Sequence, residues 1–346
     1  MRYWVLAFLM LVAWPARSQQ LPSVHLRVVG GLGQTSQFKN FEAPFWGKEL
    51  AERSAGRITA EVTPYDLDGL SGPELLQFTR LGAITIGDVP LAQVASEDPE
   101  VAGVDMPGLN PDIKSLRRSI EAYHSILADL YRERYGVELL AVWTNPAQVV
   151  FCNRPIHGLA DLKGLKVRVA SAMHSDFVEG LGAIGITTPY SGLMDALRKH
   201  VADCAITGAI SGYQIGLPSV TSYVSPVTVS WGPNILIANH DAWHRFDPAV
   251  RHFLTGQIDG LGDKMWQAAQ NDTQSGLACL TDGPCDAGPP AHMKLVPVTD
   301  DDRRLVRQSF LDTVSPRWAD RCGADCVAAW NRTVGRLFDI SVAAQD

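Results

Sequence analysis

Hydrophobic and polar residues change along the chain between patterns typical of strands and patterns typical of helices. Strand-like alternation occupies residues 24–31, 57–65, 83–90 and 137–145, and apolar residues recur at helical spacing in 38–56, 71–83 and 112–136. Ser71 and Pro73 suit the start of the second helix, and Gly56 suits the end of the first. Repeated strand and helix units favour a mostly parallel sheet flanked by helices.

A second set of elements begins at Pro146. Strands are predicted at residues 147–153, 164–170, 186–190 and 201–208, and helices at 174–183 and 191–200, the latter opened by Ser191. From residue 229 an apolar strand returns, followed by helical patterns over 248–280 and 326–342. One lobe interrupted by another, with at least two crossings, is the organisation of a protein with a hinged cleft.

The pattern therefore predicts an α/β protein with two lobes, joined by crossing strands. We expect residues 20–145 to form the first part of lobe I and residues 146–230 to form lobe II. Residues 231–346 would supply a crossing strand, return to lobe I and add the C-terminal helices.

The first residues have the layout of a secretory signal peptide. Arg2 precedes the apolar run "YWVLAFLMLVAW", and Pro15 and small residues up to Ser18 follow it. The run is roughly a dozen residues long, short of the ~20 that a spanning helix needs. We therefore expect residues 1–19 to be removed on export to the periplasm, with a buried N-terminal helix as the alternative.

Composition and charge narrow the class of partner. The chain is 46% hydrophobic and 19% charged, and its net charge of -7 argues against nucleic acid as the main partner, because phosphate binding needs a basic surface. We expect neither a cofactor nor a bound metal ion.

Six cysteines, an even number, are compatible with disulfides in an oxidising compartment. The first candidate pair flanks an Asp-Gly-Pro turn in "CLTDGPC", the second closes the small loop "CGADC", and the third lies in two strand-like segments. Six cysteines permit 15 connectivities, and a zinc site is the alternative. In order of preference, the pairs are Cys279 with Cys285, Cys322 with Cys326, and Cys152 with Cys204.

The short strand "LKVRV" carries one charged side chain toward its end. Leu165, Val167 and Val169 point to one face and Arg168 to the other, and the small residues of "ASAMHSDF" follow. A planar guanidinium at a strand end can make two parallel hydrogen bonds to a carboxylate. The alternative is an arginine that pairs with a surface Asp or Glu.

The segment from "NRPIHGLADLKGLKVRVASAMHSDF" to "HVADCAITG" resembles the central block of the extracytoplasmic solute-binding subunits of TRAP transporters, the DctP family. The resemblance extends over essentially the whole mature chain, including "SGPELLQFTRLGAITIGDV" and "ANHDAWHRFDPAVRHFL". It implies two α/β lobes, joined by crossing strands and a long helix, that close over a ligand, and TRAP membrane permease subunits as partners. It also implies that Arg168 binds the ligand carboxylate.

The sequence departs from the sialic acid and dicarboxylate binders of that family at two places. Where they carry a second arginine on the preceding strand, the alignment gives Gln148, and where they carry Asn it gives Thr207, with Cys204 in place of a Gly. One strong cation, Arg168, is then left on that wall of the cleft. A second anionic group on the ligand would lack a charge partner in a site that excludes water, which is costly. We therefore expect a monocarboxylate, with a dicarboxylate as the alternative if Arg27, Lys39 or Arg154 supplies the second cation.

Other candidates for the wall of the cleft stand at strand ends or near the crossings. Asp88 matches an acidic family position, the loop "GGLGQTSQF" offers polar groups near a helix start, and three aromatic residues can cover the ligand body, with a role in the core as the alternative for each. These candidates are Gln34, Thr35, Asp88, Tyr190, Tyr213, Trp231 and Asn234.

Two further functional classes compete with a transport receptor. A secreted enzyme would need a site such as a Cys-His pair among Cys152, Cys204, His157, His174 and His200, but no nucleophile elbow, metal-binding helix or cofactor fingerprint is present. A binding protein that reports to a receptor would share the same cleft, so the sequence does not separate it from a transport subunit.

Overall fold

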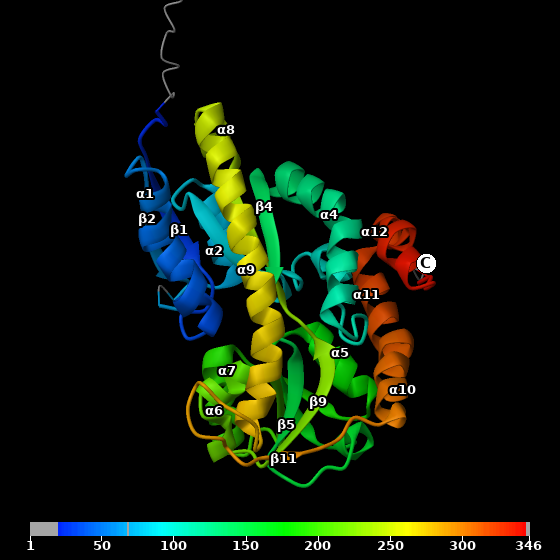
Figure 1. The fold of residues 1–346 in the computed structure, drawn as a ribbon. Helices are drawn as coiled ribbons and strands as arrows, with labels where there is room; N and C mark the ends of the chain where they lie inside the picture. Colours follow the sequence, from blue (N-terminus) through cyan, green and yellow to red (C-terminus); the bar gives the residue numbers. More distant parts are fainter. Residues whose placement is uncertain (1–19, 68, 344–346) are drawn as a thin grey trace, which may run out of the picture.

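The computed structural model describes residues 20–67 and 69–343, which form two β-sheets with helices around them, one above the other in Figure 1. The predicted signal peptide, residues 1–19, lies outside the described residues. No helix in the described ranges is long and apolar enough to cross a bilayer.

The first sheet has the strand order β2-β1-β3-β10-β4. Its strands are β1 (Val24–Gly30), β2 (Ile58–Pro64), β3 (Ile86–Pro90), β4 (Val137–Thr144) and β10 (Pro233–Asn239). Strands β1, β2 and β3 pair in parallel, as the alternating strand and helix pattern predicts. Strand β10 lies between β3 and β4 and pairs antiparallel with both, so the sheet is mixed.

The second sheet has the strand order β11-β9-β5-β8-β6-β7. Its strands are β5 (Gln148–Cys152), β6 (Lys166–Val169), β7 (Ile184–Thr187), β8 (Cys204–Gly208), β9 (Tyr223–Ser230) and β11 (Lys294–Leu295). Strand β9 begins before residue 229, where the predicted strand began. Pro226 interrupts the strand pattern there, and it lies where the register between β5 and β9 shifts.

Two strand crossings and one long helix join the sheets. Strand β4 of the first sheet continues through residues 145–147 into β5 of the second, and β9 returns through residues 231–232 into β10. Helix α9 (Pro248–Leu280) passes alongside both sheets in Figure 1 and packs against β4 and α7 (Ala209–Gln214). The predicted crossing strands and long helix are therefore present.

The long helix before β4 follows its sequence signals closely. Helix α4 (Ile113–Tyr135) begins after Asp112, whose side chain accepts from Ser115 N, and ends at Gly136, whose φ of 62° suits glycine. Helix α2 (Gly72–Arg80) begins with a capping box between Ser71 and Glu74. Short polar signals of this kind fix helix ends without tertiary contacts.

The predicted start of one helix, at Ser191, is wrong. Residues Tyr190–Gly192 form the single turn η5 after Pro189, and α6 (Leu193–Arg198) follows with Gly192 as its cap. The other helices of the first 245 residues are η1 (Phe38–Glu42), η2 (Phe45–Glu49), α1 (Leu50–Arg53), α3 (Leu91–Val94), η3 (Pro99–Val104), η4 (Leu159–Leu162), α5 (Ala172–Gly180), η6 (Leu217–Ser219) and α8 (His240–Arg245).

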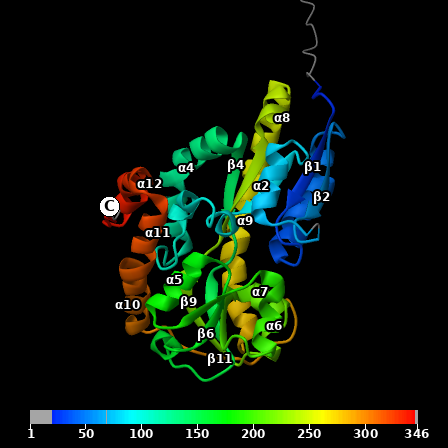
Figure 2. The same cartoon turned by 180° about the vertical axis from the view of Figure 1, so that it is seen from behind.

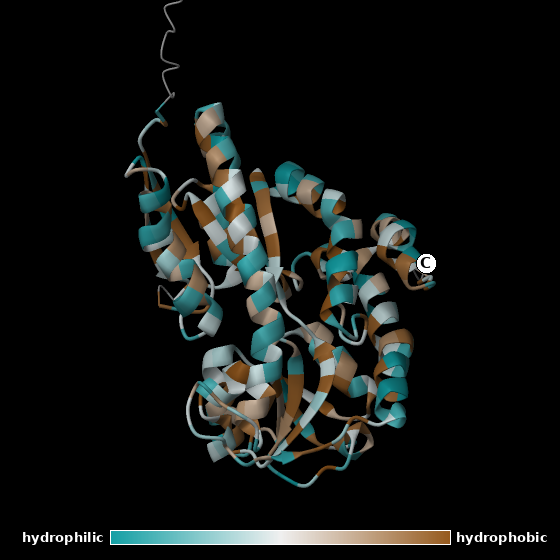
Figure 3. Ribbon diagram, viewed as in Figure 1, coloured by the Kyte–Doolittle hydropathy of each residue, from teal (hydrophilic) through white to brown (hydrophobic). Residues whose placement is uncertain are grey.

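The C-terminal helices lie along one side of both sheets, as the reverse view in Figure 2 shows. They are α10 (Asp300–Ser309), η7 (Phe310–Val314), α11 (Ser315–Cys322), α12 (Ala324–Trp330) and η8 (Asn331–Gly335). Helix α10 contacts α5 of the second lobe, whereas η8 contacts α4 of the first. Figure 3 shows brown, apolar strands inside and largely polar outer faces on α9 and α10, so the core lies between sheets and helices.

All six cysteines form disulfides in the three predicted pairs. Cys152 and Cys204 face each other across β5 and β8, and both are fully buried. The pairing removes the free thiols that a zinc site with cysteine ligands or a cysteine nucleophile would need.

Candidate ligand-binding site

Arg168 is a buried cation that forms no ion pair in the described part of the chain. Its side chain is on β6 and 1% exposed, with Nη2 donating to Thr188 O (2.5 Å), Nε to Thr188 Oγ1 (3.2 Å) and Nη1 to Ile206 O (3.3 Å). Burial lowers the pKa of Arg168 to about 10, and nearby Tyr190 opposes that shift. Because neutral acceptors leave its charge uncompensated, the site favours an anion.

Tyr190 lies beside Arg168, two residues after Thr188. Its hydroxyl donates to Ser211 O (3.4 Å). Burial raises the pKa of Tyr190 to about 12, partly offset by a hydrogen bond with the Ser211 side chain and by the positive charge of Arg168. Asp66, which follows β2 of the first sheet, also raises the pKa of Tyr190. Tyr190 and Asp66 therefore interact electrostatically although they belong to different lobes.

Tyr65 directly follows β2, in the first lobe. Its hydroxyl accepts from Gln93 Nε2 (3.1 Å), and burial raises its pKa strongly, with smaller contributions from Asp66, Asp88 and Tyr190. Tyr65 thus interacts electrostatically with Tyr190, which in turn interacts with Arg168. Sequence reasoning missed Tyr65 and Gln93, because no local pattern separates a strand-end tyrosine from a core tyrosine.

Gln148 lies on the other face of the second sheet from Arg168. Gln148 pairs with Gly208, while Arg168 pairs with Ala205, three positions away on β8, so their side chains alternate to opposite faces. The amide of Gln148 donates to Pro146 O (2.9 Å) and Trp231 O (3.4 Å), which ties it to the crossings. Thr207 is buried on the face of Arg168.

A neutral histidine stands near Arg168. His174, in the first turn of α5, has Nδ1 2.8 Å from Ser171 Oγ and Nε2 2.8 Å from Ser230 Oγ. Burial and, to a smaller extent, the positive charge of Arg168 lower its pKa to about 4. His174 therefore supplies hydrogen bonds without adding positive charge to this wall.

Two buried carboxyl groups lie beneath the loop after β1. Asp88 Oδ2 accepts from Trp143 Nε1 (3.3 Å), and Glu42 Oε2 accepts from Gly31 N (3.0 Å). Desolvation raises the pKa of Asp88 to about 7, and desolvation together with the negative charge of Asp88 raises the pKa of Glu42 well above its usual value. The pair therefore holds a proton near neutral pH, which makes this side of the lobe less anionic than its residue types suggest.

The loop that supplies Gln34 and Thr35 is shaped largely by its own hydrogen bonds. Thr35 is buried, donates to Leu32 O (2.7 Å) and accepts from Phe38 N (3.2 Å), so it caps the following helical turns. Gln34 is exposed, and its carbonyl accepts from Lys39 Nζ (3.0 Å). Gln34 in this loop and Lys39 in η1, which follows it, are therefore the two exposed residues of this contact.

Trp231 and Asn234 lie at the crossings. Asp105 Oδ2 accepts from the backbone N–H groups of Trp231 and Gly232, both at 2.8 Å, and Trp231 Nε1 donates to Asn110 O (3.2 Å). Asn234 Oδ1 accepts from Asn145 Nδ2 (3.0 Å), so the two crossings are joined side chain to side chain. Both residues hold the connection between the lobes.

Tyr213 is not among the groups that meet at Arg168. Its hydroxyl donates to Pro289 O (2.8 Å), in the segment after α9, and its ring packs with the core of the second lobe. The structure thus brings Arg168, Tyr190 and Thr207 together on one wall, places Asp88 in the other lobe, and leaves Tyr213 elsewhere.

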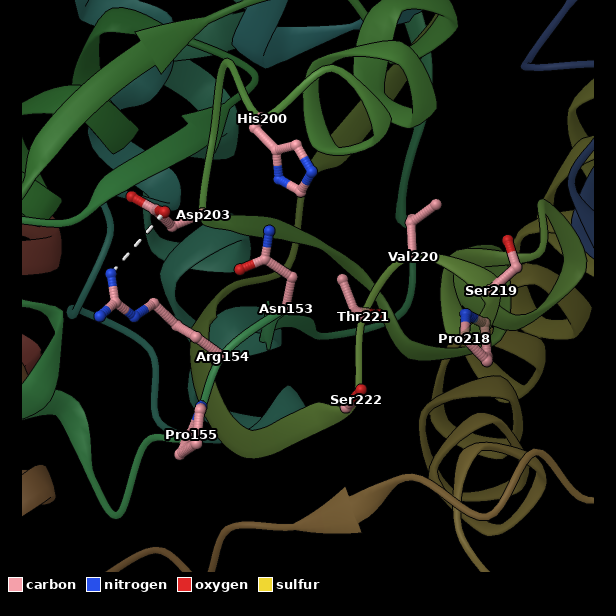
Figure 4. Close-up of a pocket in the computed structure, with 10 residues that line it drawn as sticks. All are labelled: Asn153, Arg154, Pro155, His200, Asp203, Pro218, Ser219, Val220, Thr221 and Ser222. Atoms are coloured by element: carbon pink, nitrogen blue, oxygen red, sulfur yellow. Dashed lines mark ion pairs between the residues drawn. The ribbon is translucent and has the colours of Figure 1, made fainter.

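One hollow lies away from these groups, where β5 ends and β8 begins. It has a volume of about 510 Å³ and includes an Arg154–Asp203 ion pair at 4.0 Å, shown dashed in Figure 4. The hollow lies where β5 ends and β6 and β8 begin, since Asp203 Oδ2 accepts from Lys166 N. The guanidinium of Arg168 instead donates to Ile206 O, farther along β8, and to Thr188 O, after β7. A second hollow, of about 400 Å³, lies beside Trp231 and α9.

Comparison with known proteins assigns the chain to a family of binding proteins. The family model described as "Bacterial extracellular solute-binding protein, family 7" matches residues 32–311. The C4-dicarboxylate-binding periplasmic protein DctP of Rhodobacter capsulatus is 25% identical over 289 residues, which cover 82% of this chain and 83% of that protein.

Solved structures show the same fold. A Bordetella pertussis extracytoplasmic solute receptor that binds pyroglutamic acid, DctP7, superposes with a TM-score of 0.77 at 20% identity, covering 89% of this chain and all of that one. A TRAP periplasmic solute-binding protein of Pseudomonas aeruginosa with bound L-malate gives 0.71 at 18% identity, covering 83% of this chain and 97% of that one. These structures share a fold of two lobes.

Proposed function

The chain belongs to the family 7 bacterial extracellular solute-binding proteins, the receptor subunits of TRAP transporters, and on that premise we propose that it binds a small monocarboxylate reversibly between its lobes. The family consists of solute receptors and not of enzymes. The proposed partners are the acid and the TRAP membrane permease subunits that receive it. We further propose lobe boundaries at residues 145–146 and 230–231.

The observation that carries this proposal is the uncompensated charge of Arg168. A guanidinium that is 1% exposed and has neutral acceptors alone among the described residues favours a carboxylate that arrives with the ligand. Tyr190 and Thr207 lie on the same wall, and Tyr65 and Gln93 lie in the first lobe. Neutral donors and acceptors of this kind suit a hydroxyl, keto or amide group, or a ring, on the ligand body.

A single charge is favoured because two of the three other cations considered in the sequence are engaged elsewhere. Arg27 pairs with Glu61 in an exposed ion pair, and Arg154 pairs with Asp203 at the far end of the second sheet. Lys39 donates to Gln34 O in the loop after β1 and is the remaining candidate. A dicarboxylate therefore stays the alternative, supported by the relative that binds C4-dicarboxylates and the neighbour with L-malate.

A thermal-shift screen of mono- and dicarboxylates tests the ligand class. A ligand at 100 times its Kd stabilises the folded state by roughly 2.7 kcal/mol, so the cognate acid gives a clear rise in Tm. Monocarboxylates such as pyroglutamate should raise the Tm, and small-angle scattering should then show compaction. A rise with succinate, malate or fumarate alone would overturn the monocarboxylate assignment, and recovery of a converted product would overturn reversible binding.

Periplasmic location is also part of this proposal. Residues 1–19 would be removed on export, and the disulfides suit an oxidising compartment. Cell fractionation and N-terminal sequencing of the mature protein test it, since a cytosolic protein that retains Met1 would contradict it. Uptake of labelled ligand in cells with and without the permease subunits separates a transport receptor from a sensing one.

A further inference from the structure

A glutamate and two histidines converge at the end of the first sheet that lies away from the crossings. Glu138 is the second residue of β4, and His240 and His244 lie one helical turn apart on α8, directly after β10. His240 Nδ1 lies 2.5 Å and His244 Nε2 lies 3.0 Å from Glu138 Oε1. One ligand atom from each of the three residues lies within 4.8 Å of the others.

The backbone holds these three side chains in place. Glu138 pairs with Ala238 on β10, and His240 N donates to Gly136 O (3.2 Å), so the strand end and the helix start are fixed relative to each other. Asn239 caps α8 through Ala242 N (2.9 Å) and donates to Thr79 O and Arg80 O of α2. The cluster therefore stands on paired backbone and not on a loose loop.

Two imidazoles and one carboxylate are a ligand set that Zn²⁺ accepts, with water in the fourth position. The side chains of Glu138, His240 and His244 are 20%, 38% and 49% exposed, so an ion can enter and water can complete the coordination. We propose that Glu138, His240 and His244 form a Zn²⁺ site that ties β4 to α8.

The position of Arg251, on the first turns of α9, leads to a specific prediction about this site. Its Nη1 lies 3.0 Å from His244 Nδ1, which must then act as an acceptor. A neutral His244 that binds the ion through Nε2 carries its proton on Nδ1, and a guanidinium offers no acceptor for it. Arg251 therefore leaves His244 when the ion binds, and its positive charge opposes binding.

The zinc site and the proposed carboxylate site are independent. Glu138 lies near the start of β4, whereas Asn145, at the crossing, follows its end, so the cluster is at the far end of the strand. Ligand variants of the zinc site should leave carboxylate binding unchanged. Failure of one proposal thus leaves the other standing.

The test uses the full mature chain, freed of metal by a chelator and titrated with Zn²⁺ by calorimetry. Glu138→Gln, His240→Ala and His244→Ala should each weaken Zn²⁺ binding at least about tenfold, while Arg251→Gln should tighten it. His292→Ala is the matched control, since His292 is an exposed histidine paired with Asp282 in another part of the chain. Co²⁺ in place of Zn²⁺ should give the intense visible absorption of a tetrahedral site in the wild type and lose it in His244→Ala.

Circular dichroism without metal shows whether each variant folds, so a loss of binding is read only from folded protein. The proposal is overturned if the wild type binds no Zn²⁺, if folded His240→Ala or His244→Ala binds it as tightly as the wild type, or if His292→Ala loses as much affinity as they do. An unchanged or weaker affinity in Arg251→Gln would overturn the assigned binding through His244 Nε2.

Discussion

The carboxyl groups of Glu42 and Asp88 meet beside Gly31 inside the first lobe, and in the described residues neither forms an ion pair. Glu42 is 1% exposed and Asp88 0%. A Cβ atom on Gly31 would lie 2.9 Å from Glu42 Oε1 and 3.1 Å from Asp88 Oδ2, so glycine lets the loop cover the pair. Burial makes two negative charges here costly, and a shared proton removes one of them.

This pair should make the protein less stable as the pH rises through neutrality. The folded pKa of Asp88 is raised to about 7, above the unfolded value near 3.9, so its contribution is fully present below about pH 4 and is lost as the pH rises through about 7. Asp88→Asn should flatten the fall in unfolding free energy over that window by up to about 4 kcal/mol. Urea unfolding at a series of pH values measures it.

Asp282→Asn is the control for this prediction, because Asp282 is exposed and should leave the slope unchanged. Burial also raises the pKa of Asp105 to about 7, so some dependence on pH remains in the variant. If the slope is the same in Asp88→Asn and wild type, Asp88 is not protonated in the folded protein.

Arg168→Met should keep the fold and weaken binding of the cognate acid by about 2 to 5 kcal/mol, because the bound carboxylate loses its charge partner. Arg168→Lys should recover part of that loss, since a point charge does not reproduce two parallel hydrogen bonds. Calorimetric titration measures both. Arg154→Met is the matched control, since Arg154 pairs with Asp203 at the other end of the sheet. Equal affinity in Arg168→Met and wild type would exclude the carboxylate contact.

Lys39 decides between the two ligand classes. If the ligand is a monocarboxylate, Lys39→Gln should change its affinity by less than about 1 kcal/mol, because an exposed lysine that donates to Gln34 O contributes little. If the ligand is a dicarboxylate held by Lys39, the loss should exceed that value and depend on salt. Titration at two salt concentrations separates these outcomes, and Lys48→Gln, at an exposed ion pair with Glu52, is the control.

The three disulfides should differ in their contributions to stability. In the chain-entropy view a cross-link contributes more when it closes a longer loop, and Cys152–Cys204 spans 52 residues whereas Cys322–Cys326 spans 4. Replacing the first pair by alanines should cost about 3 to 4 kcal/mol and should lower the Tm more than replacing the second. Thermal unfolding of the two double variants compares them. The reverse order would mean that packing around the cysteines dominates.

Local chemistry was enough to predict many elements and their ends. The capping Asp112 and the left-handed Gly136 bound α4, and Ser71 begins α2 through a capping box, all within a few residues of sequence. The alternation of apolar residues around Arg168 marked both the strand and the charged side chain. These helices and strands can be predicted because the hydrogen bonds and the periodicity that define them involve residues close together in the chain.

The pairing of distant segments followed from tertiary structure alone. Strand β10 enters the first sheet between β3 and β4, and no local pattern specifies which edges it joins. No local pattern predicts that Glu42 meets Asp88, or that Tyr65 interacts with Tyr190. Nor does one place Gln148 on the opposite face of the sheet from Arg168. Sequence fixes the residue types and local periods, but side chains far apart in the chain acquire their burial, charge state and partners when the two lobes pack.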